Sequence, residues 1–272
     1  MRVDLSRRLV PDELWELLAP LMPKFVSRPQ GGGTAPVEER AVFAVVVYVL
    51  TSGCAWRHLP ESFGVSPATA HRRFSVWTEA GLWRRLHRAV LDELGARGDL
   101  DCRPRSSTPR RYELKGGSLK GPNPVDRGKK GSKLHVLYEA QGLPLAVAVS
   151  GTNMHDSQAF KPLILGIYPP SDPGADPGRR RPGKIRADKA YYSTEHLRWL
   201  RSRNLIPRIA RPGIESGERR GRHRWKIERS ISWLFGYRRF TVRYERKGSH
   251  FLAFLGLAAA LTCYKRLAKL TT

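Results

Sequence analysis

Two carboxylates in the second half of the chain have the type and surroundings that phosphodiester chemistry requires. Asp188 ends a short run, KIRAD, that predicts a strand, and Glu228 lies in a predicted helix one turn after Arg224. Cleavage by two metal ions needs carboxylates from separate elements, and hard cations such as Mg²⁺ prefer oxygen ligands. Each residue also has a simpler interpretation, because Asp188 could cap the next turn and Glu228 could pair with Arg224. On spacing alone, the simpler interpretations are favoured.

The elements around these carboxylates indicate a mixed sheet covered by helices. A β-hairpin is predicted by KLHVLYE and LPLAVAVSG, which the short connection AQG joins. Two more strands are predicted at KIRAD and LIPRIA, with the helix STEHLRWLRSRN between them. Strands before helices, followed by strand–helix alternation, are typical of an α/β domain. We place this domain at residues 99–272, with a Pro/Gly/Arg loop at 169–183.

Residues 1–98 have the pattern of an all-α domain that contacts DNA. A buried helix is predicted by VEERAVFAVVVYVLTSG, which is apolar on most sides. A turn and a second helix are predicted by GVSPATAHRRFSVWTEAG, with Ser66 as the cap and Pro67 at the first helical position. Helix, turn and second helix form the layout of a helix-turn-helix module. The side chains that we expect nearest to DNA are Thr69, His71, Arg72 and Arg73. The alternative is that these side chains lie on an ordinary solvated helix face and do not contact DNA.

A second basic cluster precedes the predicted hairpin. In PVDRGKKGSK, glycines separate the cations and let backbone amides approach phosphates closely. The cations that we expect to bind DNA here are Arg127, Lys129, Lys130 and Lys133. A flexible solvated loop is the alternative.

The charge of the whole chain indicates a polyanionic partner. Lys and Arg number 49 against 24 Asp and Glu, so the formal net charge is +25. Such an excess repels itself unless a polyanion offsets it, and each cation placed on a phosphate releases a counterion. Three scattered cysteines fit a reducing cytoplasm better than a zinc site or a disulfide framework.

The sequence predicts neither a signal peptide nor a membrane-spanning helix. The N-terminus, MRVDLSRRLVPDELW, lacks the apolar core of a signal peptide. The longest apolar run, from Phe251 to Leu261, is shorter than a membrane span requires and predicts a buried helix. We therefore expect a cytoplasmic protein without a membrane partner.

Long motifs along the chain resemble those of the IS5-type insertion-sequence transposases. They are CAWRHLPESFGVSPATAHRRFSVW, GPNPVDRGKKGSKLHVL, GLPLAVAVSGTNMHDSQAF, ADKAYYS and RHRWKIERSISWLFGYRRFTVRYER. The resemblance covers nearly the whole chain, in the expected order. It implies an RNase H-like catalytic domain with a DDE carboxylate triad, preceded by a helical DNA-binding domain. Asp188 matches the second Asp of the triad and Glu228 its Glu, with Arg224 and Arg229 in the surrounding basic motif.

The activity that the resemblance implies is the transfer of DNA strands. Water, and then a DNA 3′-hydroxyl, attacks a phosphodiester at the terminal inverted repeats of the element. The implied cofactor is Mg²⁺ or Mn²⁺ held by Asp188 and Glu228. The implied partners are double-stranded DNA, both terminal repeats and target, and a second copy of the chain, because transposition requires synapsis of two ends. An RNase H-like nuclease without transposition is an alternative.

The first Asp of the triad is missing from its expected place. The family shows a strand similar to D-W-S-x-A-V-L-D-S-x-S-V-R-A-K, whereas residues 101–115 read DCRPRSSTPRRYELK. Ser107 or Thr108 occupies the position of the Asp, and two prolines predict a poor central strand. A compensated frameshift within residues 102–115 would explain the departure. Permitted codons for Arg105 to Lys115, read one base out of frame, give VLDSASVRAK, and the encoding DNA tests this hypothesis.

Loss of this Asp predicts a chain that binds DNA but transposes poorly. Neither Ser107 nor Thr108 supplies a formal negative charge, so one metal ion would lose its main ligand. The alternative is a decayed transposase that acts only as a DNA-binding protein, or as a repressor of its own element.

Overall fold

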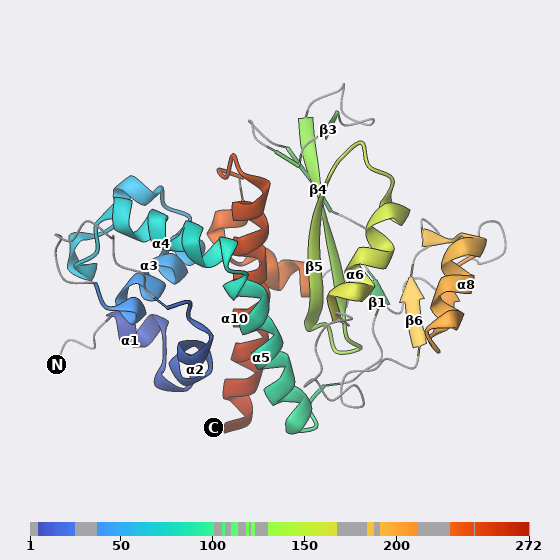
Figure 1. Ribbon diagram of the computed structural model, residues 1–272, viewed down its shortest axis with the longest axis horizontal. Coiled ribbons are helices and arrows are strands. Elements are labelled where there is room, and N and C mark those ends of the chain that lie inside the picture. The colour runs from blue at the N-terminus through green and yellow to red at the C-terminus, as the bar shows by residue number, and fades with distance from the viewer. Residues whose placement is uncertain are drawn as a thin grey trace.

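A long apolar helix, α10 (Gly248–Thr271), lies between a group of N-terminal helices and a mixed β-sheet (Figure 1). The computed structural model describes residues 5–24, 37–100, 105–106, 110–113, 118–119, 121–122, 130–167, 184–187, 191–211, 229–241 and 243–271. Within these residues, the buried apolar side chains form one cluster that runs through the helices, α10 and the sheet. Helix α10 therefore joins two parts of the chain that are far apart in sequence.

The described part of the N-terminal region is helical, as predicted. Its elements are α1 (Leu5–Leu9), α2 (Asp12–Leu18), η1 (Ala19–Leu21), α3 (Glu39–Ser52), η2 (Trp56–His58), η3 (Glu61–Phe63), α4 (Pro67–Glu79) and α5 (Leu82–Ala96). Helix α3 is buried along most of its length and ends at Gly53, whose φ of 72° lies in the left-handed region. At the start of α4, the Ser66 side chain accepts a hydrogen bond from the Thr69 amide at 3.2 Å. The predicted buried helix and the predicted Ser66 cap are both confirmed.

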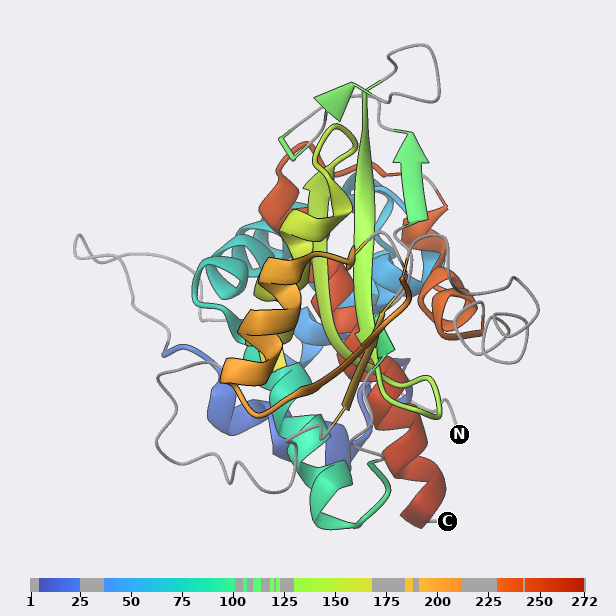
Figure 2. The same ribbon diagram turned by 90° about the vertical axis from the view of Figure 1, so that its right-hand side faces the viewer.

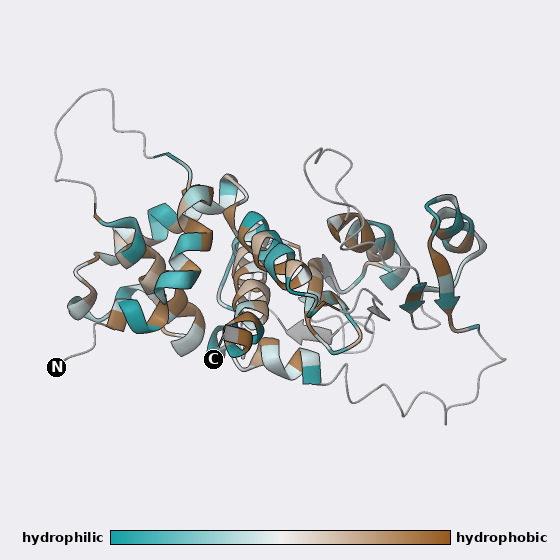
Figure 3. Ribbon diagram, turned by 90° about the horizontal axis from the view of Figure 1, so that it is seen from below, coloured by the Kyte–Doolittle hydropathy of each residue, from teal (hydrophilic) through white to brown (hydrophobic). Residues whose placement is uncertain are grey.

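Aromatic rings pack α4 and α5 against α10. Phe74 of α4 stacks on Phe254 of α10 with ring centroids 4.5 Å apart, and Trp83 of α5 lies 5.4 Å from Phe74. A Cβ at Gly256 would lie 3.3 Å from the Trp83 Cβ, so the glycine allows α5 and α10 to approach closely. Apolar and polar residues lie on different sides of many of the helices (Figure 3). Ring contacts of this kind add specific geometry to the burial of apolar area.

The sheet has the strand order expected for an RNase H-like fold. Its strands are β1 (Arg105–Ser106), β2 (Arg110–Glu113), β3 (Gly121–Pro122), β4 (Lys130–Tyr138), β5 (Pro144–Gly151), β6 (Lys184–Ala187) and β7 (Ile206–Ile209). β4 pairs antiparallel with β5 on one side and with β1 on the other, whereas β1–β6 and β6–β7 are parallel pairs. The resulting order is β5-β4-β1-β6-β7, and the short strands β2 and β3 also pair with β4. The predicted hairpin and the strands at KIRAD and LIPRIA are confirmed.

Helices cover both faces of the sheet. The elements of this region are η4 (Asp156–Ala159), α6 (Phe160–Ile167), α8 (Thr194–Ser202), a helical segment at residues 229–235 and η6 (Arg238–Phe240). Figure 2 shows α6 and α8 on one side of the β4–β5 hairpin and the segment of residues 229–235 on the other. Helix α8 connects the parallel strands β6 and β7, as parallel pairing requires. The fold class predicted from the sequence is thereby confirmed.

Helix α10 occupies the position of a core helix. By length and composition alone it could cross a membrane, but 78% of its most apolar stretch is buried against the rest of the chain. It packs against both α5 and β5, and the side chains of Phe254, Leu257 and Leu261 are buried. The prediction that Phe251 to Leu261 forms a buried helix is confirmed.

Candidate functional site

The carboxyl ends of β1 and β6 meet at one edge of the sheet, next to the positions predicted to be catalytic. Arg105 pairs with Arg186 in parallel register, so the two strands run in the same direction and end side by side. Asp188 is the second residue after Arg186, and Ser107 is the second residue after Arg105. Both positions, and Glu228, lie outside the described residues. The described strands therefore define the edge of the sheet, and the arrangement of the carboxylates stays a prediction.

The register against β4 changes by one residue between β1 and β2. Ser106 pairs with Leu137, and Arg110 pairs with Leu134. Four positions separate Ser106 from Arg110, whereas three separate their partners Leu137 and Leu134 on β4. One extra residue on one side of a strand pair is the pattern of a β-bulge. Residues 107–109, which lie outside the described part, contain the place where the family resemblance puts the first Asp.

The segment predicted to be a poor central strand nevertheless supplies β1 and β2. β1 pairs with β4 on one side and with β6 on the other, so it is central in the sheet. Its described residues are Arg105 and Ser106, and Pro104 and Pro109 stand close to them in the sequence. The prolines therefore do not prevent β1 from pairing with a strand on each side.

The helical segment that follows Glu228 in the sequence contacts the turn between β4 and β5. Arg229, predicted to bind DNA, donates from Nη2 to the backbone oxygen of Gln141 at 2.6 Å. Its guanidinium also lies 5.0 Å from the ring centroid of Trp233. These contacts give Arg229 a role in positioning the segment, whereas Arg224 lies outside the described residues.

Lys133, which was predicted to bind DNA, is buried at the sheet. It is 5% exposed and donates to Asp156 Oδ1 at 2.8 Å and to the Met154 backbone oxygen at 2.7 Å. A buried ammonium group needs such partners because its desolvation is costly. The prediction of a DNA contact is therefore wrong for Lys133. The structure does not describe the side chains of the other three cations of this cluster, which are Arg127, Lys129 and Lys130.

The outer face of α4 presents two of the four side chains predicted to contact DNA. His71 and Arg72 are exposed. Thr69 is half-buried, and its hydroxyl accepts a hydrogen bond from Ser66 Oγ at 3.0 Å. The described geometry thus leaves His71 and Arg72 available to a ligand at this face.

Arg73 differs from the prediction because it lies on the inner face of α4. It is 7% exposed, and its guanidinium lies 3.7 Å from the Glu39 carboxylate of α3. Each residue turns an α-helix by about 100°, and this rotation carries Arg73 beside the buried Phe74. The expectation that Arg73 faces outward is therefore wrong.

His71 lies in a cluster that includes residues from both ends of the chain. Its ring centroid is 5.4 Å from that of Trp56 and 5.5 Å from that of His250 in α10. Partial burial, together with the charges of Lys247 and Arg239, lowers the pKa of His71 below its usual value. The imidazole of His71 is therefore mostly neutral at neutral pH.

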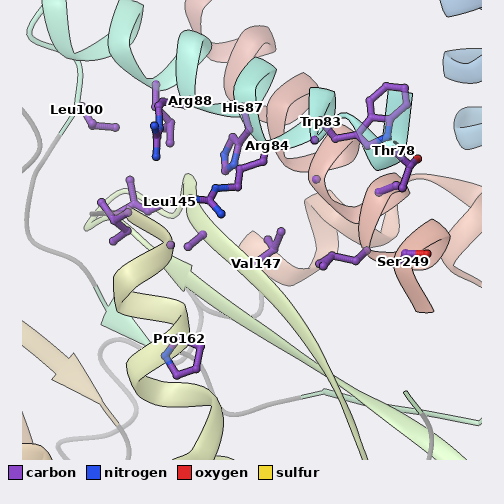
Figure 4. Close-up of a pocket in the computed structure, with 18 residues that line it drawn as sticks. Thr78, Trp83, Arg84, His87, Arg88, Leu100, Leu145, Val147, Pro162 and Ser249 are labelled. Carbon is purple, nitrogen blue, oxygen red and sulfur yellow. Dashed lines mark hydrogen bonds between the residues drawn. The ribbon is translucent and has the colours of Figure 1, made fainter. Parts of the chain in front are cut away.

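A cavity of about 350 Å³ lies between α5, α6, α10 and β5 (Figure 4). Its walls are mainly apolar, and Arg84, His87 and Arg88 lie along its α5 side (Figure 4). His87 Nε2 is 2.8 Å from the Pro144 backbone oxygen, and burial lowers the pKa of His87 to about 4. Among the described residues that line the cavity there is no Asp or Glu, so it lacks the ligands that Mg²⁺ prefers.

The carboxylates available for a metal ion form an incomplete set. In the described part of the chain, no group of three His, Cys, Asp or Glu side chains is placed to hold a metal. The oxygen ligands of Asp188 and Glu228 suit a hard divalent cation, but the third carboxylate of the expected triad is missing from positions 107 and 108. Asp188 and Glu228 thus have the oxygen ligands that such an ion prefers, but the expected set of three carboxylates lacks one.

Comparison with known proteins identifies the family. Residues 107–263, more than half of the chain, match the family model described as the transposase DDE domain. The chain belongs to the DDE transposases. Residues 10–87 match a second model, which describes transposases assigned to the IS4/5 family.

Two relatives of this transposase come from one insertion element of Burkholderia cepacia. The protein assigned as the transposase of insertion sequence element IS402 is 40% identical over 147 residues, which are 54% of this chain and 69% of that protein. An uncharacterised 16.2 kDa protein of IS402 is 37% identical over 99 residues, which are 36% of this chain and 67% of that protein.

Solved transposase structures resemble this transposase only weakly. The Mos1 paired-end complex with the left transposon end is 11% identical, with a TM-score of 0.30 and coverage of 89% of this chain and 82% of that chain. The pre-cleavage Mos1 transpososome is 8% identical, with a TM-score of 0.29 and coverage of 87% and 81%. At such scores the likeness does not define the fold, so the assignment rests on the strand order and the family model.

Two buried arginines of the transposase were not predicted from the sequence as positioning residues. Arg239 pairs with Glu245 at 2.6 Å and donates to the Cys54 backbone oxygen at 2.6 Å. Arg243 donates to Ser132 Oγ in β4 at 2.7 Å. These contacts attach the residues that precede α10 to the helical region and to the sheet. The alternation of Arg and Glu in YRRFTVRYER was the available signal.

Proposed function

We propose that this transposase is built to cut and join DNA at the terminal inverted repeats of an insertion sequence, with Asp188 and Glu228 as catalytic carboxylates. The observation that carries the proposal is the parallel pairing of Arg105 with Arg186. A continuation of both strands in this register would bring position 107 beside Asp188, as a shared metal site requires. The net charge of +25 and the family match support a DNA substrate.

The carboxylates of Asp188 and Glu228 would hold Mg²⁺ or Mn²⁺. When bound, such ions activate the attacking oxygen and stabilise the leaving oxygen of a phosphodiester. The chain's own basic and polar side chains would hold the DNA backbone and fix its position relative to the carboxylates. The residues proposed for this role are Thr69, His71, Arg72, Arg127, Lys129, Lys130, Arg224 and Arg229.

The assembly that we propose is a homodimer on DNA in the cytoplasm. Synapsis brings two element ends together, which one copy for each end accomplishes. Each copy would combine a helical DNA-binding domain at residues 1–98 with the catalytic domain at residues 99–272. Helix α10 would connect them, because it packs against both α5 and β5.

The same proposal makes this chain a poor catalyst of transposition. Neither Ser107 nor Thr108 carries a formal negative charge, and the register against β4 changes between Ser106 and Arg110. The missing Asp also favours the second candidate function, a DNA-binding protein that represses its own element. Binding to the terminal repeats without strand transfer is the behaviour expected in that case.

Replacement of residues 102–115 by the family-like strand tests the proposal. The replaced chain should show Mg²⁺-dependent strand transfer on the matching terminal repeats, whereas the original chain should only bind them. A matched control carries the same strand with Asn in place of its Asp, and Asp188→Asn in the replaced chain is a second control. Robust transfer by the original chain would refute the predicted inactivity. Failure of the replaced chain, with DNA binding retained, would favour the repressor.

A further inference from the structure

The outer face of α4 and the start of α10 form one surface. His71 of α4 and His250 of α10 lie with their ring centroids 5.5 Å apart. Lys247, directly before α10, is exposed, and its backbone oxygen accepts a hydrogen bond from the Phe251 amide in the first turn. Figure 1 shows the start of α10 beside α4. We call the group of Trp56, His71, Arg72, Lys247 and His250 the α4–α10 surface.

Buried contacts hold the α4–α10 surface in place. His250 is itself buried, with its ring centroid 5.3 Å from that of Phe74 and its Nε2 3.4 Å from Ser75 Oγ. Trp56 also contacts His71 edge-on, with ring centroids 5.4 Å apart. The side chains that remain exposed to a ligand are His71, Arg72 and Lys247.

The charges on this surface favour an anion. Burial, then Lys247 and Arg239, lower the pKa of His71. Burial, then His71 and Lys247, lower the pKa of His250, while Glu79 raises it. Among the described residues, Glu79 is thus the one acidic group that acts on either imidazole. Cations that depress the pKa of a neighbouring imidazole are stabilised when an anion arrives.

We propose that the α4–α10 surface binds a DNA phosphate through His71, Arg72 and Lys247, and that His71 takes up a proton from solvent as the phosphate binds. The proposal rests on the proposed function and deepens it in two respects. It assigns a DNA contact to Lys247, directly before α10 and outside the helix-turn-helix segment. It also makes DNA binding dependent on pH.

The chemistry of the three side chains suits a phosphodiester. Arg72 and Lys247 supply permanent positive charge, and the imidazolium of His71 adds a further charge and an N–H donor. The bound phosphate raises the pKa of His71 relative to the free protein. The affinity for DNA therefore increases as the pH falls through the pKa that His71 has in the complex. The increase ends at the pH where His71 is also protonated in the free protein. A DNA duplex is the favoured source of the phosphate because His71 and Arg72 lie on the second helix of the helix-turn-helix layout.

Fluorescence anisotropy of the full chain with a labelled random-sequence duplex tests the proposal. From about pH 8 to about pH 6, affinity should increase by up to about tenfold per pH unit, the limit for uptake of one proton. His71→Gln should remove most of this dependence. Lys247→Ala should weaken binding and reduce the log–log salt slope by about 0.9, as expected for loss of one phosphate contact.

Arg201→Ala is the matched control. Arg201 is an exposed arginine at the end of α8, which Figure 1 places on the far side of the sheet from α4. This variant should leave the pH dependence and the salt slope unchanged, and thermal melting should show that all three variants fold. The substituted side chains are exposed, so loss of the fold is not expected.

Three outcomes would overturn the proposal. The proposal is overturned if the original chain binds DNA but His71→Gln keeps the pH dependence of affinity and Lys247→Ala keeps the log–log salt slope. That outcome leaves the proposed function intact. Failure of the original chain to bind any duplex overturns the proposed function as well. Binding to phosphatidylserine vesicles that depends on His71 and Lys247, while duplex binding does not, assigns the surface to a membrane instead of DNA.

Discussion

Replacing Glu245 by Gln tests whether a buried ion pair holds the residues before α10 in place. Arg239 Nε lies 2.6 Å from Glu245 Oε1, and the two side chains are 5% and 4% exposed. The substitution keeps the shape of the side chain and leaves the Arg239 guanidinium buried without its counter-charge. Removing one partner of a buried pair costs about 3–5 kcal/mol. We expect about 3 kcal/mol, the lower end, because Gln retains a carbonyl oxygen that can accept the hydrogen bond.

Urea unfolding followed by circular dichroism measures this loss. The control is Glu93→Gln, because Glu93 pairs with Arg97 at 2.8 Å with side chains that are 36% and 38% exposed. An exposed pair of this spacing contributes about 0.3–0.5 kcal/mol, so the control should barely change the free energy of unfolding. Equal losses in the two variants would refute the reasoning. The double variant Arg239→Met with Glu245→Leu should recover part of the stability, because no charge remains buried.

Two further predictions concern stability. Burial lowers the pKa of both His87 and His135 from 6.5 to about 4, so the unfolded chain binds more protons than the folded chain between these values. The free energy of unfolding should fall as the pH drops through this window, by up to about 1.4 kcal/mol per pH unit for each histidine. His87→Gln should reduce this dependence in urea unfolding, and an identical pH profile for the variant would contradict the assignment. Ser66→Ala should cost about 1 kcal/mol through loss of the cap on α4, and a melting temperature no lower than that of Ser62→Ala would argue against it.

Local sequence pattern was sufficient to predict α3, α4 and the β4–β5 hairpin, but not the strands β1 and β2. The apolar segment VEERAVFAVVVYVLTSG forms the buried helix α3, and KLHVLYE with LPLAVAVSG forms the hairpin β4–β5. Such elements are predictable because their periodicity and length are set by neighbouring residues. Ser66 and Pro67 likewise mark the start of α4 by local chemistry.

Whether a basic side chain is buried or exposed depends on tertiary packing, which the local sequence pattern does not show. Arg73 and Lys133 were expected at DNA because they are basic, yet each is buried against a carboxylate that is distant in sequence. The partners Glu39 and Asp156 could be found only from the fold. The carboxylates Asp188 and Glu228 were singled out by the family resemblance, since spacing alone favoured simpler interpretations of both.

The position of α10 has a consequence for how the transposase is made. During translation, α4 and α5 leave the ribosome long before Phe254, which packs against Phe74 and completes their core. Contacts between residues so far apart in sequence form slowly, and until then the nascent helices expose apolar surface that chaperones recognise. His250 reaches His71 only at the same late stage. A nonsense mutation upstream of α10 would therefore leave α4 and α5 without their packing partner, although the codons for both helices remained intact.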